Sequence, residues 1–151
     1  MGTGEQLKYG WIKGYELNVE GYMTAAQTMR QKSGRFVYLD SAGRCTLNAD
    51  GAGRIWGHAE YLGDSEGSED DRVKVNIALD AVYRIPINSG TFVKAMIGDE
   101  CDISISSNIQ GAQLDVSDED TLMVVGGDLV NSNWVDVKIV GDLQGTGNGV
   151  V

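Results

Sequence analysis

The sequence predicts an all-β protein, built as a small barrel or sandwich, with two related β units as one option and at most one short helix. Three observations predict this fold class. The longest apolar alternation has a period of two, and most other apolar runs are short and bounded by glycine or acidic turns. In addition, 21 of the 151 residues are glycine and only one is proline. Since about 7% glycine is average, the chain is rich in tight turns.

The alternation runs from Val73 to Ile87, where every odd-numbered residue is apolar and most of the residues between them are polar. Successive side chains of a strand point to opposite faces, so this pattern indicates a strand with one buried face. Because strands usually run about 5 to 6 residues, we expect a bend or break near Asp80. Pro86 cannot donate a ladder hydrogen bond and suits a sheet edge.

A similar rhythm near the start, from Tyr9 to Val19 and interrupted at Lys13, predicts a second long strand or an extended arm. Only Thr24 to Lys32 has a helical pattern, with Thr24 as a cap and Gly34 beyond its end. The remaining candidate strands are short: Arg35 to Leu39, Arg44 to Leu47, Arg54 to Leu62, Phe92 to Ile97, Cys101 to Ile105, Thr121 to Val125 and Trp134 to Val140.

Two stretches of the chain echo each other. Gly34 to Val37, followed by Cys45, returns 56 positions later as Gly90 to Val93, followed by Cys101. The strand pattern from Val73 to Ile77 returns 62 positions later, from Val135 to Ile139. The echo indicates either a duplication or a coincidence. A duplication would divide the chain into an N-terminal strand or arm (1–22), a first β unit (23–87), a second β unit packed with the first (88–143) and a flexible tail (144–151).

Charge and hydropathy exclude several classes of partner. Twelve basic and 22 acidic residues leave a net charge of −10, which repels nucleic-acid phosphates and anionic lipid. No apolar run reaches the roughly 18 residues that span a bilayer, and the first residues lack the pattern of a signal peptide. We therefore expect a soluble protein made in the cytoplasm that binds neither nucleic acid nor membrane.

No catalytic constellation stands out. The stretch from Gly63 to Gly67 matches the G-x-S-x-G elbow of hydrolases around Ser65, but acidic residues follow it and the only histidine, His58, precedes it. A near match to a dinucleotide fingerprint at residues 51–57 leads into a strand and not a helix, and a calcium-loop pattern from Asn48 has its bidentate acid out of register. We expect His58 to be structural, and we expect no catalytic residue and no cofactor.

Acidic residues gather around positions 64–71, 99–102 and 115–120. They are better explained as solvated loop charge than as metal ligands, and we expect no metal site, although cation binding by these loops stays open. Cys45 and Cys101 are expected to be small buried residues, with a disulfide between them left open.

Aromatic residues are dense at the start of the chain, where Tyr9, Trp11, Tyr15 and Tyr22 fall within 22 residues. Such a density is typical either of a partner interface or of core packing. Our candidate partner-binding residues are Tyr9, Trp11, Tyr15 and Leu17.

Three stretches together resemble a known family: Lys32 to Asp40 (KSGRFVYLD), Ile55 to Ala59 (IWGHA) and Arg72 to Val75 (RVKV). They resemble the small SH3-like β-barrel units of tailed-bacteriophage capsid decoration (cement) proteins. The resemblance covers residues 30–79, with a looser echo at 88–140. It implies a structural virion protein, added to the outside of an icosahedral head, whose partner is the major capsid protein and which often forms a homotrimer.

Two other functions stay open. One is a phage tail or baseplate β-domain. The other is a carbohydrate-binding module, for which Trp11, Trp56, Trp134 and the tyrosines would supply stacking surfaces.

Overall fold

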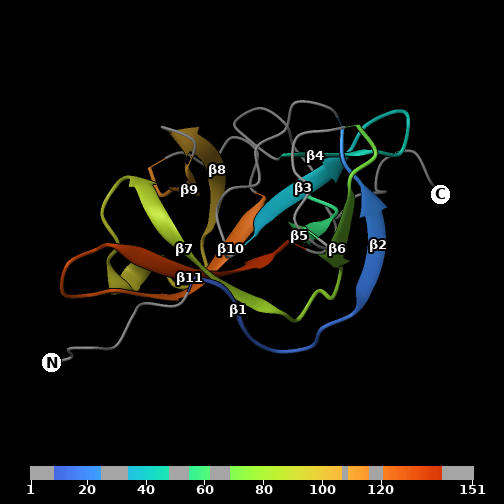
Figure 1. The fold of residues 1–151 in the computed structure, drawn as a ribbon. Helices are drawn as coiled ribbons and strands as arrows, with labels where there is room; N and C mark the ends of the chain where they lie inside the picture. Colours follow the sequence, from blue (N-terminus) through green and yellow to red (C-terminus); the bar gives the residue numbers. More distant parts are fainter. Residues whose placement is uncertain are drawn as a thin grey trace, which may run out of the picture.

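The computed structural model describes residues 9–24, 34–47, 55–61, 69–106, 109–115 and 121–140. In these ranges the chain forms eleven strands and one 3-10 helix, arranged as two sheets (Figure 1). The predicted all-β class is therefore confirmed. The elements are β1 (Gly10–Lys13), β2 (Asn18–Tyr22), β3 (Arg35–Leu39), β4 (Cys45–Leu47), β5 (Gly57–Tyr61), β6 (Arg72–Asn76), β7 (Val82–Ser89), η1 (Lys94–Met96), β8 (Glu100–Ser106), β9 (Ile109–Gln113), β10 (Leu122–Gly127) and β11 (Trp134–Ile139).

The first sheet has the strand order β2-β6-β5-β3-β4, with antiparallel neighbours throughout. A parallel bridge between Met23 and Cys45 joins its two edges, and the Thr24 amide donates to the Cys45 carbonyl oxygen at 3.0 Å. The sheet thus closes into a small barrel, which we call the first barrel.

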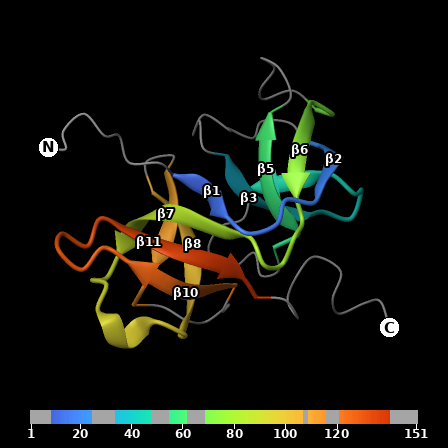
Figure 2. The ribbon, with the colours of Figure 1, turned by 90° about the horizontal axis from the view of Figure 1, so that it is seen from below.

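The second sheet has the order β1-β7-β11-β10-β8-β9. Here β9 also pairs with β7 in parallel, through Ile87 and Ala112, so that β7 to β11 form a second closed barrel. Strand β1 adds to this barrel by pairing with the first half of β7. The two barrels stand next to each other in Figure 2.

Both barrels have the same topology. The five strands of each barrel, numbered 1 to 5 in chain order, are arranged around the barrel in the order 1-5-4-2-3. In each barrel, parallel pairing of strand 3 with strand 1, or with the residue that follows strand 1, closes the ring. The pairing registers also agree, since Val19 and Ala59 both face Val75, while Tyr83 and Val124 both face Val137. Equivalent residues by register include Val37 and Cys101, Leu39 and Ile103, Cys45 and Ala112, and Val73 and Val135.

This equivalence confirms one half of the sequence echo and corrects the other. The segments from Val73 and from Val135 do form equivalent strands, β6 and β11. Gly90 to Val93 is not the counterpart of Gly34 to Val37, because this segment leads into η1. By register, the residue of the second barrel that is equivalent to Val37 is Cys101. The true counterpart of Gly34 by register is Gly98, and both have a positive φ, +85° and +96°.

The two long alternating segments break where they pass between barrels. From Val73 to Ile87, β6 ends at Asn76 and β7 begins at Val82, so the break expected near Asp80 is observed. The change of sheet thus precedes the expected unit boundary after Ile87, since β7 belongs to the second barrel. The N-terminal segment splits likewise into β1 and β2. Its described part, residues 9–22, is built into both barrels and is not a detached arm.

Other local predictions were less accurate. Phe92 to Ile97 is not a strand: the Phe92 ring packs over Gly127, and the 3-10 helix η1 follows. Strand β9, with the sequence IQGAQ, was missed because it has neither β-branched alternation nor aromatic residues. The expected helix from Thr24 lies almost wholly outside the described residues, and the expected tail at 144–151 lies outside them entirely.

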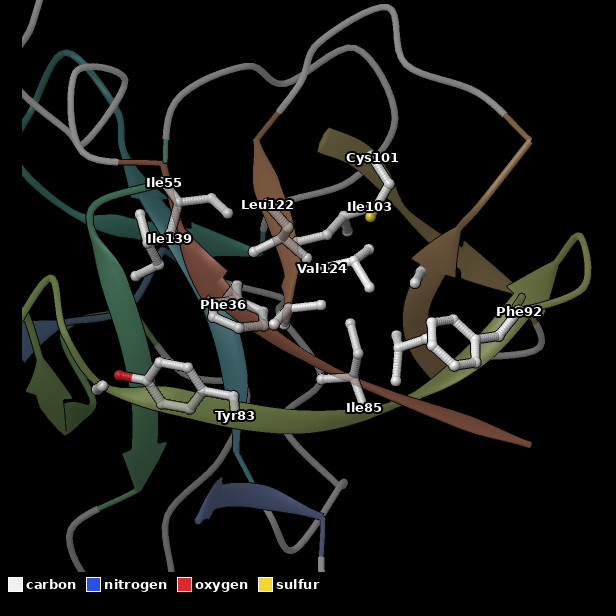
Figure 3. Packing of buried hydrophobic residues seen from close by; sticks show 14 of the residues in the cluster. Phe36, Ile55, Tyr83, Ile85, Phe92, Cys101, Ile103, Leu122, Val124 and Ile139 are labelled. Atoms are coloured by element: carbon white, nitrogen blue, oxygen red, sulfur yellow. The ribbon is translucent and has the colours of Figure 1, made fainter. Parts of the chain in front are cut away.

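The barrels share a core. Phe36 of β3 points away from the interior of its own barrel, whereas its neighbour Val37 points inward. The Phe36 ring lies edge-on to Tyr83, with centroids 5.1 Å apart, and belongs to the core of the second barrel (Figure 3). Gln110 completes the contact: its side-chain amide accepts from the Phe36 N–H at 2.7 Å and donates to the Phe36 carbonyl at 3.0 Å. The two barrels therefore pack against each other.

Candidate interaction surface

Two crossovers carry the chain between the barrels, and they lie side by side (Figure 1). Residues 14–17 connect β1 to β2, and residues 77–81 connect β6 to β7. Gly14 makes the close approach possible, because it has φ +92° and a Cβ there would lie 2.2 Å from the Asp80 carbonyl oxygen. The two crossovers cross the junction as one packed unit.

Asn76 holds the crossovers together. Its buried side chain accepts hydrogen bonds from the amides of Leu17 (3.0 Å) and Ala78 (3.1 Å), and it donates to the carbonyl of Tyr15 (3.4 Å). The Ile77 amide adds a direct bond to the Leu17 carbonyl at 2.9 Å. These bonds tie the backbone of the first crossover at Tyr15 and Leu17 to the start of the second at Ile77 and Ala78, and so fix the two segments relative to each other.

On this fixed backbone, three large apolar side chains face solvent: Tyr15 is 73% exposed, Leu17 57% and Leu79 42%. We call these three residues the crossover surface. Exposed apolar residues are ordinary when scattered, but here they sit together on adjacent, hydrogen-bonded segments. The arrangement suits contact with another macromolecule, because little conformational freedom of the backbone would be lost on binding.

The four partner-binding residues predicted from sequence thus divide into two pairs. Tyr15 and Leu17 are exposed, as an interface needs. Trp11 packs against the core of the second barrel, and Tyr9 is partly buried near Arg84 and Asp128, where burial raises the pKa of its phenol. Leu79 was not predicted, because its side chain reads as one more apolar position in the alternation of Val73 to Ile87.

His58 has a structural place. Its ring is buried, stacks on Tyr83 at 4.5 Å and meets Phe36 edge-on at 4.9 Å. Desolvation lowers its pKa to about 3, which keeps the imidazole neutral. In the described residues no three His, Cys, Asp or Glu side chains gather as metal ligands would.

Several sequence candidates fall outside the described ranges: the elbow with Ser65, the calcium-loop pattern from Asn48 to Gly53, and the acidic residues at 118–120. The near-fingerprint at 51–57 is described only from Ile55; strand β5, which begins at Gly57, lies within the strand expected from Arg54 to Leu62. Both cysteines are buried and neither is in a disulfide; burial raises the pKa of Cys45 to about 11. They are core residues.

The tryptophans considered for sugar stacking are all partly buried. Trp56 packs against the first core, as Trp11 does against the second. The face of Trp134 is covered by the Arg84 guanidinium, whose Cζ lies 3.7 Å from the ring centroid. Arg84 is held there by a bidentate pair with Asp136, at 2.7 and 3.0 Å. A sugar would have to displace this arginine to stack on Trp134.

A second exposed apolar feature was missed by sequence reasoning. In the turn between β10 and β11, Leu129 is 60% and Val130 86% exposed. The only signal was Asp128 followed by Asn131, Ser132 and Asn133, which marks a turn but says nothing of how rigidly it is held.

Comparison with known proteins finds no matching family model, no matching curated protein and no matching solved structure. Among the described residues no helix is long and apolar enough to cross a membrane.

Proposed function

We propose that this protein is a structural virion component that binds the outer surface of an assembled bacteriophage capsid and stabilises it. The observation that carries the proposal is the crossover surface, an exposed apolar group on backbone fixed by Asn76. Such a surface suits recognition of another protein through shape and apolar burial. The phenol of Tyr15 is the only polar side-chain group of its three residues.

The double barrel supports this role. Phe36 and the Gln110 side chain join the two barrels, so the exposed residues are displayed on a body with a shared core. A protein that binds the assembled lattice, and not loose subunits, shifts the equilibrium against disassembly by mass action. Closed rotational symmetry would let one patch serve every protomer, and a homotrimer is the arrangement that the family resemblance implies.

The described side chains weigh against an enzyme and, in part, against a carbohydrate-binding module. The three tryptophans are engaged in packing or stacked under Arg84, so among the described residues the exposed rings of Tyr15 and Tyr22 are the aromatic surfaces left for a sugar to stack on. The buried, neutral His58 has no exposed face for a substrate. No observation favours a tail or baseplate position over the head.

The test is binding of the purified protein to expanded heads of its own phage that lack it. We expect saturable binding, and we expect the heads to withstand heating better once it is bound. Leu17→Ser should weaken binding at least tenfold, as removal of a central apolar contact does. Ile109→Ser removes an exposed apolar side chain from β9, outside the crossover surface, and should bind as the wild type does.

Absence of saturable binding to heads would overturn the proposal. Electron microscopy that located the protein on tails would replace it with the tail or baseplate assignment. Light scattering of the free protein and of the bound layer tests the trimer.

A further inference from the structure

The turn between β10 and β11 presents two neighbouring apolar side chains, Leu129 and Val130, to solvent. It projects at the end of the second barrel near η1, away from the crossovers, in both Figure 1 and Figure 2. It is therefore separate from the crossover surface and unused by the function proposed above.

The turn is held by Asp128. One carboxylate oxygen accepts from the amides of Val130 (3.0 Å) and Asn131 (3.1 Å), and the other accepts from Asn133 (3.1 Å). These N–H bonds lower the pKa of the carboxyl group. The Asp128 backbone closes the turn, since its amide donates to the Trp134 carbonyl and its carbonyl accepts from the Ser132 amide.

A neighbouring segment braces the turn from the side. The Phe92 amide donates to the Ser132 hydroxyl oxygen at 2.7 Å, and Ser132 has a positive φ of +57°. Val93, the next residue, is also exposed. A hydrogen-bonded turn with apolar side chains at its tip is preorganised, so inserting it into a pocket costs little ordering.

The surroundings indicate what kind of pocket this is. In residues 128–134 there is no lysine or arginine, and in residues 90–98 only Lys94. The guanidinium of Arg84, which lies over Trp134, is paired with the carboxylate of Asp136. Apolar tips that enter lipid usually have several cations beside them to hold anionic headgroups, and the whole chain carries a net charge of −10. Nucleic acid is disfavoured by the same charge. An apolar pocket on a protein remains.

We propose that the Leu129–Val130 turn is a rigid apolar plug that inserts into a pocket of the capsid protein, as a second contact besides the crossover surface. This inference rests on the proposed function, and it makes binding bivalent. Two contacts on one rigid body bind more tightly than either alone, provided that both can be reached at once.

The experiment compares the wild type with Leu129→Ser/Val130→Ser in cosedimentation with expanded heads that lack the protein. We expect the double variant to bind about tenfold to a hundredfold more weakly, with an unchanged thermal midpoint, because both side chains are exposed before binding. Ile109→Ser is the matched control and should bind normally. Asp128→Ala keeps both apolar side chains but frees the turn, and should weaken binding by a smaller factor.

Two further measurements test whether the turn binds lipid or a second copy of the chain in place of the capsid protein. Flotation with vesicles of phosphatidylserine and phosphatidylcholine should show no binding, and sedimentation equilibrium should give the same oligomer for the wild type and the double variant. Vesicle binding or an altered oligomer that depends on Leu129 and Val130 would overturn the plug in favour of lipid or a second copy. If the double variant binds heads as tightly as the wild type, the plug is overturned and the proposed function stands. If the wild type does not bind heads, both the proposed function and the plug are overturned.

Discussion

At the scale of single residues, three polar side chains join what would otherwise be two separate barrels. Asn76 binds the crossovers, Gln110 binds the backbone of Phe36 across the junction, and His58 fills the space between two aromatic rings. Each is buried, and an unsatisfied polar atom at such a site would cost more free energy than a typical hydrogen bond contributes. Their burial at the junction is therefore explained by the contacts that they make there.

His58 predicts a pH dependence of stability. Its pKa is about 3 in the folded protein and near 6.5 when unfolded, so in that interval the unfolded chain binds the extra proton. Its contribution to stability is therefore complete above pH 6.5 and is lost as the pH falls. We expect the free energy of unfolding to drop by about 2 kcal/mol between pH 7 and pH 5, as measured by urea denaturation.

His58 is the only histidine in the chain, so the control is direct. In His58→Phe the slope between pH 7 and pH 5 should be nearly flat, whatever the absolute stability of the variant. An equal slope in both proteins would show that another group causes the pH dependence.

The hydrogen bonds of Asn76 predict that substitutions at this position lower the free energy of unfolding. Asn76→Ala removes the bonds to Leu17, Ala78 and Tyr15 and should lower the free energy of unfolding by about 2–3 kcal/mol, measured in urea. Asn76→Asp keeps the acceptor for the two amides but places a buried, charged carboxylate oxygen against the Tyr15 carbonyl oxygen, so at neutral pH it should cost at least as much. A loss below about 1 kcal/mol in Asn76→Ala would mean that the side-chain bonds are not what holds the crossovers.

At the scale of elements, each barrel repeats one arrangement of five strands, and a glycine with positive φ stands before the second strand of each. Gly34 and Gly98 occupy this place. Their surroundings differ: a Cβ on Gly34 would lie 2.6 Å from the Ala59 carbonyl oxygen, whereas a Cβ on Gly98 would meet nothing within 4 Å. Equivalent positions therefore carry different constraints: the Gly98 amide donates to the Val124 carbonyl of β10, but the space where its Cβ would lie is open.

This difference predicts unequal effects of the same substitution. Gly98→Ala should cost only the strain of the left-handed backbone, about 1 kcal/mol. Gly34→Ala adds a steric clash with backbone and should cost about 3 kcal/mol or more, as measured by thermal or urea unfolding. Similar losses at both sites would contradict the close contact between Gly34 and β5.

Local sequence patterns predicted the individual strands better than they predicted which residues of the two barrels are equivalent. The alternation from Val73 to Ile87 identified β6, β7 and the break between them, because a half-buried strand must alternate. The echo aligned Cys45 with Cys101, although pairing makes Val37 the counterpart of Cys101. Strands of different length and unequal loops shift the offset, so equivalence is visible only in the register. Of the predicted site, Tyr15 and Leu17 are exposed; Leu79 and the β10–β11 turn depend on long-range packing that no linear pattern shows.

At the scale of the whole molecule, the barrels share a core and yet do not use equivalent surfaces to meet. Phe36 and His58 of the first barrel pack against the second, whereas their counterparts by register, Glu100 and Met123, include an exposed charge. The contact therefore joins two different surfaces, as in a head-to-tail assembly. On the second barrel, Glu100 stands at the position where the same contact with a further barrel would need an aromatic residue. Such a head-to-tail contact can otherwise propagate into rings or filaments.

A shared core predicts cooperative unfolding of the two barrels. Val75 and Val137 are equivalent, fully buried residues of the central strands β6 and β11. Because Phe36 and Tyr83 couple the barrels, opening either one should expose the core of the other. Val75→Ala and Val137→Ala should each lower the free energy of unfolding by about 2 kcal/mol, and in native-state hydrogen exchange each should lower the protection of β6 and β11 amides by the same amount.

The control is Ile109→Ser, an exposed position that should leave both sets of amides unchanged. Phe36→Ala should separate the barrels: with the ring removed, Val137→Ala should reduce protection in β11 more than in β6. If Val137→Ala already acts on β11 alone in the otherwise native chain, the barrels are independent units. The two apolar contacts proposed above would then be carried on bodies free to move, and the gain from binding both at once would shrink accordingly.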